Sequence, residues 1–468
     1  MKFLLSLLAA SSLVSAALSP ITVKGNAFYD SKTNKRFFIK GVDYLPGGSS
    51  DFSDPLLDID VCKRDIEYFK DLGLNSIRVY SVDNSGDHSE CMKLLDEAGI
   101  YLILDVNTPK NSINRASPAN SYNTAYLQHV FATIDAFKDY DNLLGFFAAN
   151  EVINDENTTS SAPYVKATIR DMKAYIKAQS KRSIPVGYSA ADISANRLQQ
   201  AEYFNCGSDE ERLDMFGMND YSWCGKSSFS LSGYDKKVET YSGYTKPMFL
   251  SEFGCNEITP RPFTEVEAIY STDMSSVFSG GLVYEYSEED NKYGLVEISK
   301  SGEITKKTDY NNLKSELAKV EMPSGDAGAS TKTDASKCPA YEAGVWEVDP
   351  DAAIPSMPKR ASAFLTDGAG KALGTNGPNT SYGDEGDIAD NQAAAEKALT
   401  AKTTSKAPSA TASGSAAAAS AVSASASASA SASGNAAAAI APAPLDFIVV
   451  APLAVLLSST VFGALMVL

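Results

Sequence analysis

Short apolar runs alternate with amphipathic stretches along roughly the first 320 residues of the chain. The runs are apolar throughout rather than at every second position, which is typical of strands buried on both faces of a parallel sheet. The stretches between them carry apolar residues at helical spacing, and the one over 60–73, DVCKRDIEYFKDLG, closes on Gly73, a helix-stop signal. The predicted strands are the eight runs 36–44, 75–82, 100–106, 142–151, 183–192, 213–223, 246–254 and 280–289.

Eight strands, mostly separated by helices, within about 300 residues predict a (β/α)8 TIM barrel, an α/β fold. The alternative is an open, doubly wound sheet. That fold would place a glycine-rich phosphate loop after its first strand, and no G-x-G-x-x-G occurs there. We therefore predict a catalytic barrel over residues 18–340.

Polar or aromatic side chains stand where the predicted strands end. The run from Gly145 stops on Asn150 and Glu151, and the run FLSEFG carries Glu252 at the corresponding point. In a TIM barrel the carboxyl ends of the strands form the catalytic face. One such residue could be the ordinary start of a loop, but similar ends on all the strands predict a site. The other strand-end residues are Asp43, Tyr44, Arg78, Tyr80, Asp105, Asp192, Tyr221 and Tyr284.

Glu151 and Glu252 form a candidate pair of catalytic carboxylates. Retaining glycoside hydrolysis uses two carboxyl groups about 5–5.5 Å apart, one a nucleophile and one an acid/base. The fourth and seventh strands face each other across the mouth of an eight-stranded barrel, so this separation is plausible. Asn150 could hydrogen-bond a sugar 2-hydroxyl. Arg78 could keep Glu252 ionised, and burial could raise the pKa of Glu151 so that it stays a proton donor. The alternative is a pair of surface or salt-bridged glutamates.

Aromatic residues near the strand ends could line a sugar-binding groove or could pack in the core. They are Tyr80, Tyr221, Trp223, Tyr284 and Tyr286. Two polar loops, 107–115 and 191–197, follow the third and fifth strands and could hold a second sugar chain. Their candidate residues are Asn107, Arg115, Asp192 and Arg197. A local ion pair is the alternative for the last two.

Other chemistries find little support in the sequence. The two histidines, His88 and His129, do not stand at strand ends. The nucleophile elbow G-x-S-x-G, the zinc motif H-E-x-x-H and a metal-binding sequence cluster do not occur, so we expect neither a metal nor a cofactor. The formal net charge of −17 without a basic stripe argues against nucleic acid as a partner and is compatible with a neutral polysaccharide.

Both ends of the chain carry targeting patterns. Residues 1–17 have a basic start, an apolar middle and small residues at the end, as in a secretory signal peptide. The apolar stretch up to Leu468 follows small residues and a short spacer, with no Lys or Arg behind it. We expect 436–468 to be a GPI-attachment signal and Asn435 the attachment residue; a tail-anchored transmembrane helix is the alternative. Between barrel and signal we expect an acidic and polar linker over 341–401 and a disordered Ser/Ala-rich stalk over 402–435.

Two further features fit secretion. Asn157 and Asn379 each begin an acceptor sequence for N-glycosylation. The sequence has six cysteines and no C-x-x-C pair, which favours disulfides over a zinc site. Six cysteines allow fifteen disulfide pairings, and the sequence alone leaves them open. The cysteines are Cys62, Cys91, Cys206, Cys224, Cys255 and Cys338.

Six stretches carry a resemblance to a known family: GVDYLPGG, RVYSVD, AANEVI, NDYSWCG, SEFGCN and GGLVYEYSEEDNKYGLV. As a set they resemble the fungal β-1,3-glucanosyltransferases, glycoside hydrolase family 72. The resemblance implies a TIM barrel, a GPI anchor and a retaining mechanism with Glu151 as acid/base and Glu252 as nucleophile. It also implies donor-glucan contacts by Tyr80, Asn150 and Tyr284, acceptor contacts by Asp192 and Arg197, and the disulfides Cys62–Cys91, Cys206–Cys338 and Cys224–Cys255.

The chain departs from the family pattern at Leu45, where members often carry Gln after the Tyr, and this puts one sugar contact in doubt. Only Cys338 lies beyond the last predicted strand, so the cysteine-rich carbohydrate-binding module of some members is missing.

The implied enzyme cleaves β-1,3-glucan internally and transfers the new reducing end to the non-reducing end of another glucan at the cell surface. An endo-β-1,3-glucanase would need the same residues, with water as acceptor. A non-catalytic wall protein is a third reading, against which the intact Glu151 and Glu252 argue. We expect the protein to be a monomer.

Overall fold

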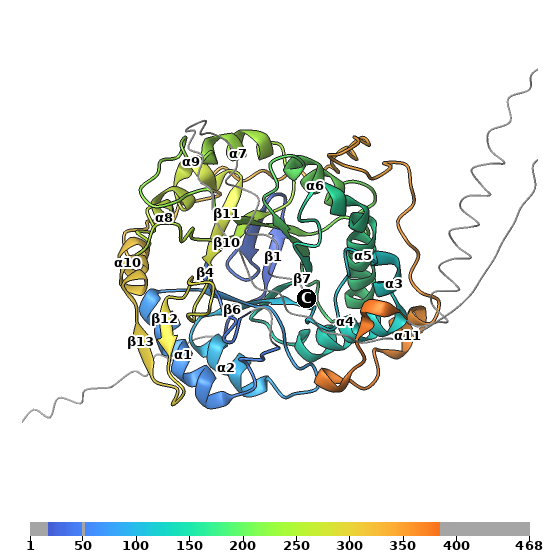
Figure 1. Cartoon of the computed structure of the whole chain (residues 1–468), viewed down its shortest axis with the longest axis horizontal. Helices are drawn as coiled ribbons and strands as arrows, with labels where there is room; N and C mark the ends of the chain where they lie inside the picture. Colours follow the sequence, from blue (N-terminus) through green and yellow to red (C-terminus); the bar gives the residue numbers. More distant parts are fainter. Residues whose placement is uncertain (1–16, 49–51, 384–468) are drawn as a thin grey trace, which may run out of the picture. The chain divides into compact units, whose positions relative to one another are not determined.

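Eight parallel strands close into a barrel, in the order β10-β11-β4-β5-β6-β7-β8-β9 (Figure 1). The structure is a computed structural model and describes residues 17–48 and 52–383. The barrel strands are β4 (Ile39–Asp43), β5 (Ser76–Val79), β6 (Tyr101–Asp105), β7 (Leu143–Asn150), β8 (Val186–Ala191), β9 (Met215–Asp220), β10 (Met248–Phe253) and β11 (Phe278–Val283). Each predicted strand therefore corresponds to one barrel strand, and the TIM-barrel prediction is confirmed.

Helices surround the barrel (Figure 1). The longer ones are α1 (Ile59–Leu72), α2 (Ser89–Glu97), α4 (Thr124–Phe137), α5 (Ala162–Gln179), α6 (Arg197–Phe204), α7 (Tyr234–Tyr241) and α10 (Thr308–Leu317); the short ones are α3 (Pro118–Ser121), α8 (Glu265–Ile269) and α9 (Thr272–Ser275). Local sequence fixes the ends of α1. The Asp58 side chain accepts hydrogen bonds from the backbone N–H groups of Asp60 and Val61, and Gly73 ends the helix at φ +69°.

A three-stranded antiparallel sheet of β1 (Ile21–Lys24), β2 (Ala27–Asp30) and β3 (Arg36–Phe37) precedes the barrel. Ile21 and Phe28 of this sheet join a buried cluster with Phe147 and Phe249 from inside the barrel. The sheet therefore covers the amino-terminal end of the barrel and leaves the opposite end as the open face. The sequence pattern had merged β3 and β4 into a single strand. A hairpin of β12 (Val296–Ile298) and β13 (Ile304–Lys306) follows β11.

Residues 341–383, which we call the C-terminal strap, pack along the outside of the barrel (Figure 1). The strap contains η2 (Ala361–Ala363), α11 (Phe364–Asp367), η3 (Gly374–Asn376) and η4 (Thr380–Tyr382). Trp346 is fully buried and contacts Tyr203 of α6, and Phe364 contacts Phe131 of α4. We had expected a linker from residue 341. Instead, as far as residue 383, a few widely spaced apolar side chains without helical or strand periodicity fix this segment to the barrel.

Three disulfides join Cys62 to Cys91, Cys206 to Cys338 and Cys224 to Cys255, the same pairs that the family resemblance implied. Cys206–Cys338 joins the residues just after α6 to the segment immediately before the strap. Among the described residues, no helix is both long and apolar enough to cross a bilayer. The signal peptide apart from its last residue, the Ser/Ala-rich stalk, Asn435 and the GPI signal lie outside the described residues.

Candidate active site

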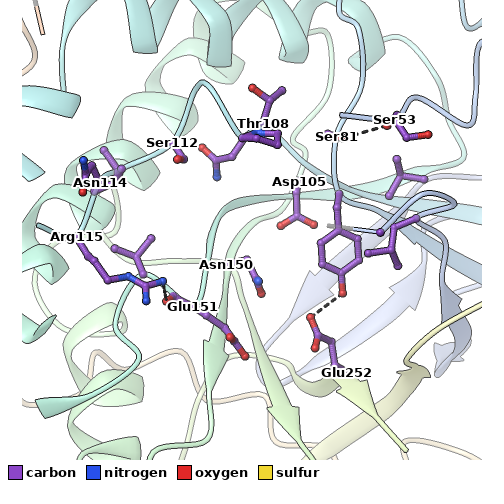
Figure 2. Close-up of a pocket in the computed structure, with 18 of the residues that line it drawn as sticks. Ser53, Ser81, Asp105, Thr108, Ser112, Asn114, Arg115, Asn150, Glu151 and Glu252 are labelled. Atoms are coloured by element: carbon purple, nitrogen blue, oxygen red, sulfur yellow. Dashed lines mark hydrogen bonds between the residues drawn. The ribbon is translucent and has the colours of Figure 1, made fainter. Parts of the chain in front are cut away.

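A groove of about 410 Å³ opens at the carboxyl ends of the barrel strands and contains both candidate carboxylates. Glu151 directly follows β7 and Glu252 lies on β10. Their side chains approach the same open space, with Asn150 and Asp105 beside it (Figure 2). The further lining residues include Tyr44, Leu45, Tyr80, Asn107, Thr108, Ser112, Asn114, Arg115, Tyr284, Asn379 and Ser381.

Glu252 is buried and held by three donors. The hydroxyl of Tyr80 donates to Oε1 at 2.7 Å, and the hydroxyl of Tyr221 donates to Oε2 at 2.7 Å. Arg78 Nη1 lies 3.4 Å from Oε1. Both carboxylate oxygens are therefore fixed in place, which suits a group that must present one oxygen to a reacting carbon in a defined direction.

The side chain of Glu151 has fewer hydrogen-bond partners than that of Glu252, but its backbone is fixed on both sides of the residue. Its Oε1 accepts one hydrogen bond, from Asn219 Nδ2 at 2.8 Å. Its backbone has φ +48°, which is rare for a residue with a side chain, while its N–H donates to Ser189 and its carbonyl accepts from Arg115 Nη2 at 2.9 Å. These bonds at the β7 end hold the unusual backbone, which turns the carboxyl group into the groove.

Arg78 joins the two halves of the site. Its guanidinium donates two hydrogen bonds to Asp105, from Nε at 2.8 Å and from Nη2 at 3.1 Å. Nη2 also donates to Asn150 Oδ1 at 3.1 Å, and this oxygen in turn accepts from Asn219 Nδ2 at 3.1 Å. A continuous network therefore runs from Glu252 through Arg78, Asn150 and Asn219 to Glu151.

Burial, together with the charge of Glu151, raises the pKa of Glu252 to about 7, although Arg78 and the two tyrosine hydroxyls act in the opposite direction. Arg78 was expected to keep Glu252 ionised, and it does act in that direction. Burial and the charge of Glu151 outweigh it, and only one of its nitrogens reaches Glu252 while two donate to Asp105. Burial also raises the pKa values of Tyr80 and Tyr221 well above their usual range, so both hydroxyls remain donors.

The predicted groove residues separate into two groups. Tyr80, Asp105, Asn107, Arg115 and Tyr284 line the groove. Tyr221 contacts Glu252 from one side. By contrast, Trp223 and Tyr286 are core residues: the indole N–H of Trp223 donates to Thr264 and the hydroxyl of Tyr286 donates to buried Asp65. Packing therefore accounts for these two side chains.

Asp192 and Arg197 form the ion pair that was their alternative interpretation, with Arg197 Nε 2.9 Å from Asp192 Oδ1. Lys237 adds contacts to Asp192 at 3.1 Å and to Asp220 at 2.5 Å. These four side chains tie the β8–α6 loop to the end of β9 and to α7. They are not among the residues that line the groove around Glu151 and Glu252.

Sequence reasoning missed Asn219, Asn379 and Ser381. Asn219 contacts both Glu151 and Asn150 from the end of β9. Its position in the polar end of the run GMNDYSW, two residues before the predicted Tyr221, was a usable signal. No strand-end argument could have found Asn379 and Ser381, because they belong to the strap.

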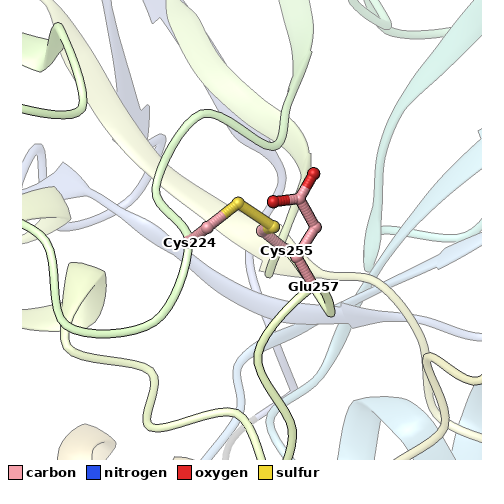
Figure 3. Close-up of side chains that lie close together, drawn as sticks. All are labelled: Cys224, Cys255 and Glu257. Atoms are coloured by element: carbon pink, nitrogen blue, oxygen red, sulfur yellow. A yellow bond between two sulfur atoms is a disulfide. The ribbon is translucent and has the colours of Figure 1, made fainter. Parts of the chain in front are cut away.

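Cys224, Cys255 and Glu257 lie close enough together to suggest a metal site (Figure 3). The two sulfur atoms are bonded to each other, with an S–S distance of 2.00 Å. Metal ions bind the thiolate form of cysteine, which a disulfide does not offer. This cluster among the described residues is therefore a loop clamp between the ends of β9 and β10.

A TIM barrel with two glutamates at the carboxyl ends of its strands defines the class of carbohydrate-active enzymes that use paired carboxylates. A family model described as glucanosyltransferase matches residues 10–321, and the chain belongs to this family.

The chain is similar to 1,3-beta-glucanosyltransferase GAS5 of Saccharomyces cerevisiae, with 62% identity over 368 residues, 78% of this chain and 75% of that protein. It is also similar to 1,3-beta-glucanosyltransferase gel1 of Aspergillus fumigatus, with 58% identity over 360 residues, 77% of this chain and 78% of that protein. Among solved structures, a mutant of Saccharomyces cerevisiae Gas2p in complex with laminaritetraose and laminaripentaose matches with a TM-score of 0.68 and 42% identity, covering 74% of this chain and 76% of that one.

Proposed function

We propose that this protein is a retaining 1,3-β-glucanosyltransferase that elongates cell-wall glucan. One observation carries the proposal: Glu151 and Glu252 face one groove from β7 and β10, joined by a single hydrogen-bond network. The family and the printed activity of the relatives supply the substrate, β-1,3-glucan. The oligosaccharides bound to the similar Gas2p structure support the same substrate class.

In the reacting form the two carboxyl groups carry one proton between them, and it is on Glu151. In the first half of the reaction, an oxygen of ionised Glu252 attacks the anomeric carbon of an internal glucose unit. The bond from that carbon to the bridging oxygen breaks, and the proton of Glu151 moves to this oxygen as the leaving chain departs. Glu252 now holds the donor fragment as a glycosyl ester. Tyr80 and Tyr221 position its carboxylate, and Asn150 is the candidate donor to the sugar 2-hydroxyl.

In the second half, the non-reducing end of another glucan enters the groove. Ionised Glu151 accepts the proton of its 3-hydroxyl, the hydroxyl oxygen attacks the anomeric carbon, and the ester bond to Glu252 breaks. A new β-1,3 bond forms, and both carboxyl groups return to their starting protonation. Asp105, Asn107, Arg115 and Tyr284 line the groove and are the candidate sugar contacts. Asp192 and Arg197 would act on the acceptor side by fixing the β8–α6 loop.

The first test is the size of the products. A chain spanning residues 18–383, which includes the strap, is incubated with a reduced β-1,3-glucan oligosaccharide, and the products are separated by length. Products longer than the starting oligosaccharide are expected. Products that are only shorter would mean that water is the acceptor and that the protein is an endo-β-1,3-glucanase.

Glu151→Gln and Glu252→Gln test the assignment of the two carboxylates. Each removes a group that must gain or lose a proton or form the ester, so we expect a loss of at least about 10²-fold in kcat, because general acid–base catalysis alone contributes about 10²–10⁴-fold. Glu257→Gln, in the loop that follows β10 and outside the groove lining, is the control and should retain activity. Substantial turnover by either active-site variant would contradict the mechanism.

We also propose that the protein is secreted, N-glycosylated and held at the outer face of the plasma membrane by a GPI anchor. The amino-terminal and carboxyl-terminal sequence patterns support this. Phosphatidylinositol-specific phospholipase C should release the protein from intact cells. Retention on the cells after treatment would favour a transmembrane anchor.

A further inference from the structure

The C-terminal strap follows a fixed path over the outside of the barrel. Asn196 donates a hydrogen bond to the carbonyl of Val345, Arg170 donates to the carbonyl of Pro355, and Gln128 donates to the carbonyl of Ala369 at 3.1 Å. These donors come from the start of α6, from α5 and from α4 in turn. The strap therefore passes the helices in reverse chain order and returns to the loops beside β5 and β6.

The last part of the strap, residues 374–382, is fixed by buried amides of the barrel loops. Asn84 accepts from the N–H of Gly374 at 3.0 Å, Asn111 donates to the carbonyl of Pro378 at 3.0 Å, and Asn123 donates to the carbonyl of Thr380 at 2.8 Å. Asn84, Asn111 and Asn123 are each at most 4% exposed. Each of these amides also bonds to barrel residues, Asn84 to His129 and Thr133, Asn111 to Thr108 and Asn123 to Asn120 and Tyr126. The barrel therefore orients all three amides, and one polar atom of each bonds to the strap, which makes the contact specific.

Gly374 shows how closely the strap approaches the barrel. Its φ is +55°, and a Cβ atom at this position would lie 2.0 Å from Oδ1 of Asp83. Only glycine fits both the conformation and the space. The strap is thus seated against the β5–α2 loop by close backbone contact.

The strap also contacts the loop 107–115, which carries two of the predicted sugar contacts. The N–H of Thr380 donates to the carbonyl of Lys110 at 3.0 Å. On either side of Thr380, the exposed Asn379 and the half-buried Ser381 line the same groove as Glu151 and Glu252. The strap therefore contributes one wall of the groove from a part of the chain beyond residue 321, where the match to the family model ends.

We propose that residues 379–381 form a sugar-binding wall of the groove and that Asn379 and Ser381, which stand beside Lys110 and outside the hydrogen-bond network of the two glutamates, bind glucose units remote from the cleaved linkage. This proposal rests on the proposed action on β-1,3-glucan. An amide and a hydroxyl both donate and accept hydrogen bonds, which matches the hydroxyl groups of a neutral sugar. Their place on a wall fixed by buried amides gives them the rigidity that a binding site needs.

The wall has a consequence for N-glycosylation. Asn379 begins the acceptor sequence Asn-Thr-Ser, and a glycan on its amide would occupy the groove where the substrate should lie. The proposal therefore requires an unmodified Asn379 in the active enzyme. Asn157 in η1 (Glu156–Ser161) is exposed and is not among the groove-lining residues, so a glycan is compatible with activity there.

The test measures kcat/KM of the full secreted enzyme on reduced β-1,3-glucan oligosaccharides of increasing length. Asn379→Ala and Ser381→Ala should lower kcat/KM about 3- to 10-fold on long oligosaccharides, the size of one net hydrogen bond, and leave it unchanged on the shortest substrate that is cleaved. Asn379→Asp keeps the acceptor that caps Ser381 but removes the amide donor, so it separates sugar binding from local folding. Asn376→Ala, an exposed asparagine of the same strap outside the groove lining, is the matched control.

Equal losses on all substrate lengths, or no loss on any, would overturn the proposal, as would a glycan found by mass spectrometry on Asn379 of fully active enzyme. If wild-type enzyme yields only shortened products, glucanosyl transfer fails as its function, but the length dependence of substrate consumption still decides the role of the wall. An enzyme that consumes no β-1,3-glucan of any length would overturn both proposals.

Discussion

At the scale of single residues, the site depends on Arg78. This side chain is fully buried, and it pairs with Asp105 while reaching Glu252 and Asn150. Its guanidinium also lies 4.1 Å from the ring centre of Tyr80, which itself donates to Glu252. Because Asp105 is buried too, removal of the guanidinium would leave an unpaired charge inside the barrel.

Arg78→Lys tests this role. A lysine keeps the positive charge but lacks the planar fork that reaches Asp105 and Asn150 together. We expect kcat to fall at least about 10²-fold, the size of the loss that a misplacement of about 1 Å causes at a catalytic centre. Steady-state kinetics measures this, with circular dichroism to establish that the variant is folded. A folded variant with near-normal kcat would mean that charge alone is sufficient.

The interaction between the two glutamates can be measured separately. The charge of Glu151 is, after burial, the largest cause of the raised pKa of Glu252. Glu151→Gln removes that charge, so the pKa of Glu252 should move down from about 7. A glucosyl fluoride donor needs no proton from Glu151 as it leaves, and the pH dependence of its reaction reports the ionisation of Glu252. An unchanged or higher pKa would show that the two carboxyl groups do not interact as the structure places them.

At the scale of elements, the strap is the part that ordinary barrel architecture does not require. Its largest anchor is Trp346, which is fully buried with its ring centre 5.3 Å from that of Tyr203 on α6. Nearby, the disulfide Cys206–Cys338 fixes the segment immediately before the strap. The strap is thus held covalently near its start, by an aromatic side chain next, and by buried amides at its far end.

Trp346→Ala should lower the free energy of unfolding by about 3–5 kcal/mol, the usual cost of removing a buried aromatic side chain. Tyr341→Ala, at a position of the same strap that is 56% exposed, should change it by less than about 0.5 kcal/mol. Urea unfolding followed by circular dichroism gives both values. A small effect of Trp346→Ala would indicate that the strap is not part of the cooperative fold.

At the scale of the whole molecule, several buried carboxyl groups have raised pKa values. Burial is the main cause in each case, and it raises the pKa of Glu252 and of Glu265 to about 7, of Glu285 to about 8 and of Asp171 to about 6. Their ordinary values are 4.5 for Glu and 3.8 for Asp. The folded protein therefore holds protons on these groups at a pH at which the unfolded chain has released them.

A raised pKa in the folded state contributes stability below the unfolded pKa, and this contribution is lost as the pH rises through the folded pKa. We therefore expect the melting temperature to fall as the pH rises from about 5 to about 7.5. Buried His129 acts in the opposite direction, because burial lowers its pKa to about 4 from 6.5. The carboxyl groups with raised pKa values outnumber it. Thermal unfolding followed by circular dichroism at several pH values measures the slope.

Glu265 does not line the groove, so Glu265→Gln should leave catalysis intact. It should reduce the fall of the melting temperature with pH, because it removes one carboxyl group with a raised pKa. A melting temperature that rises steadily over the same pH range would contradict the raised pKa values of these carboxyl groups in the folded state.

The sequence by itself determined the barrel and its two carboxylates, because both follow from local patterns. Continuous apolar runs such as 142–151 mark strands buried on both faces, and a polar residue that interrupts such a run at its end must face the open end of the barrel. Glu151 and Glu252 were visible for this reason, and so were Asn107 and Arg115 in the loop that follows the third strand.

Only the tertiary structure decided which polar groups meet. Asn219 reaches Glu151 because β7, β8 and β9 are consecutive strands of the closed barrel, and Arg78 pairs with Asp105 because β5 and β6 are neighbours. The strap has no helical or strand periodicity in its apolar residues. Isolated residues such as Trp346 fix it through contacts with helices that are distant in the sequence. The strap places Asn379 in the groove because it hydrogen-bonds to buried asparagines on several barrel loops. Those loops come together only when the barrel closes, so the sequence of the strap alone resembled a linker.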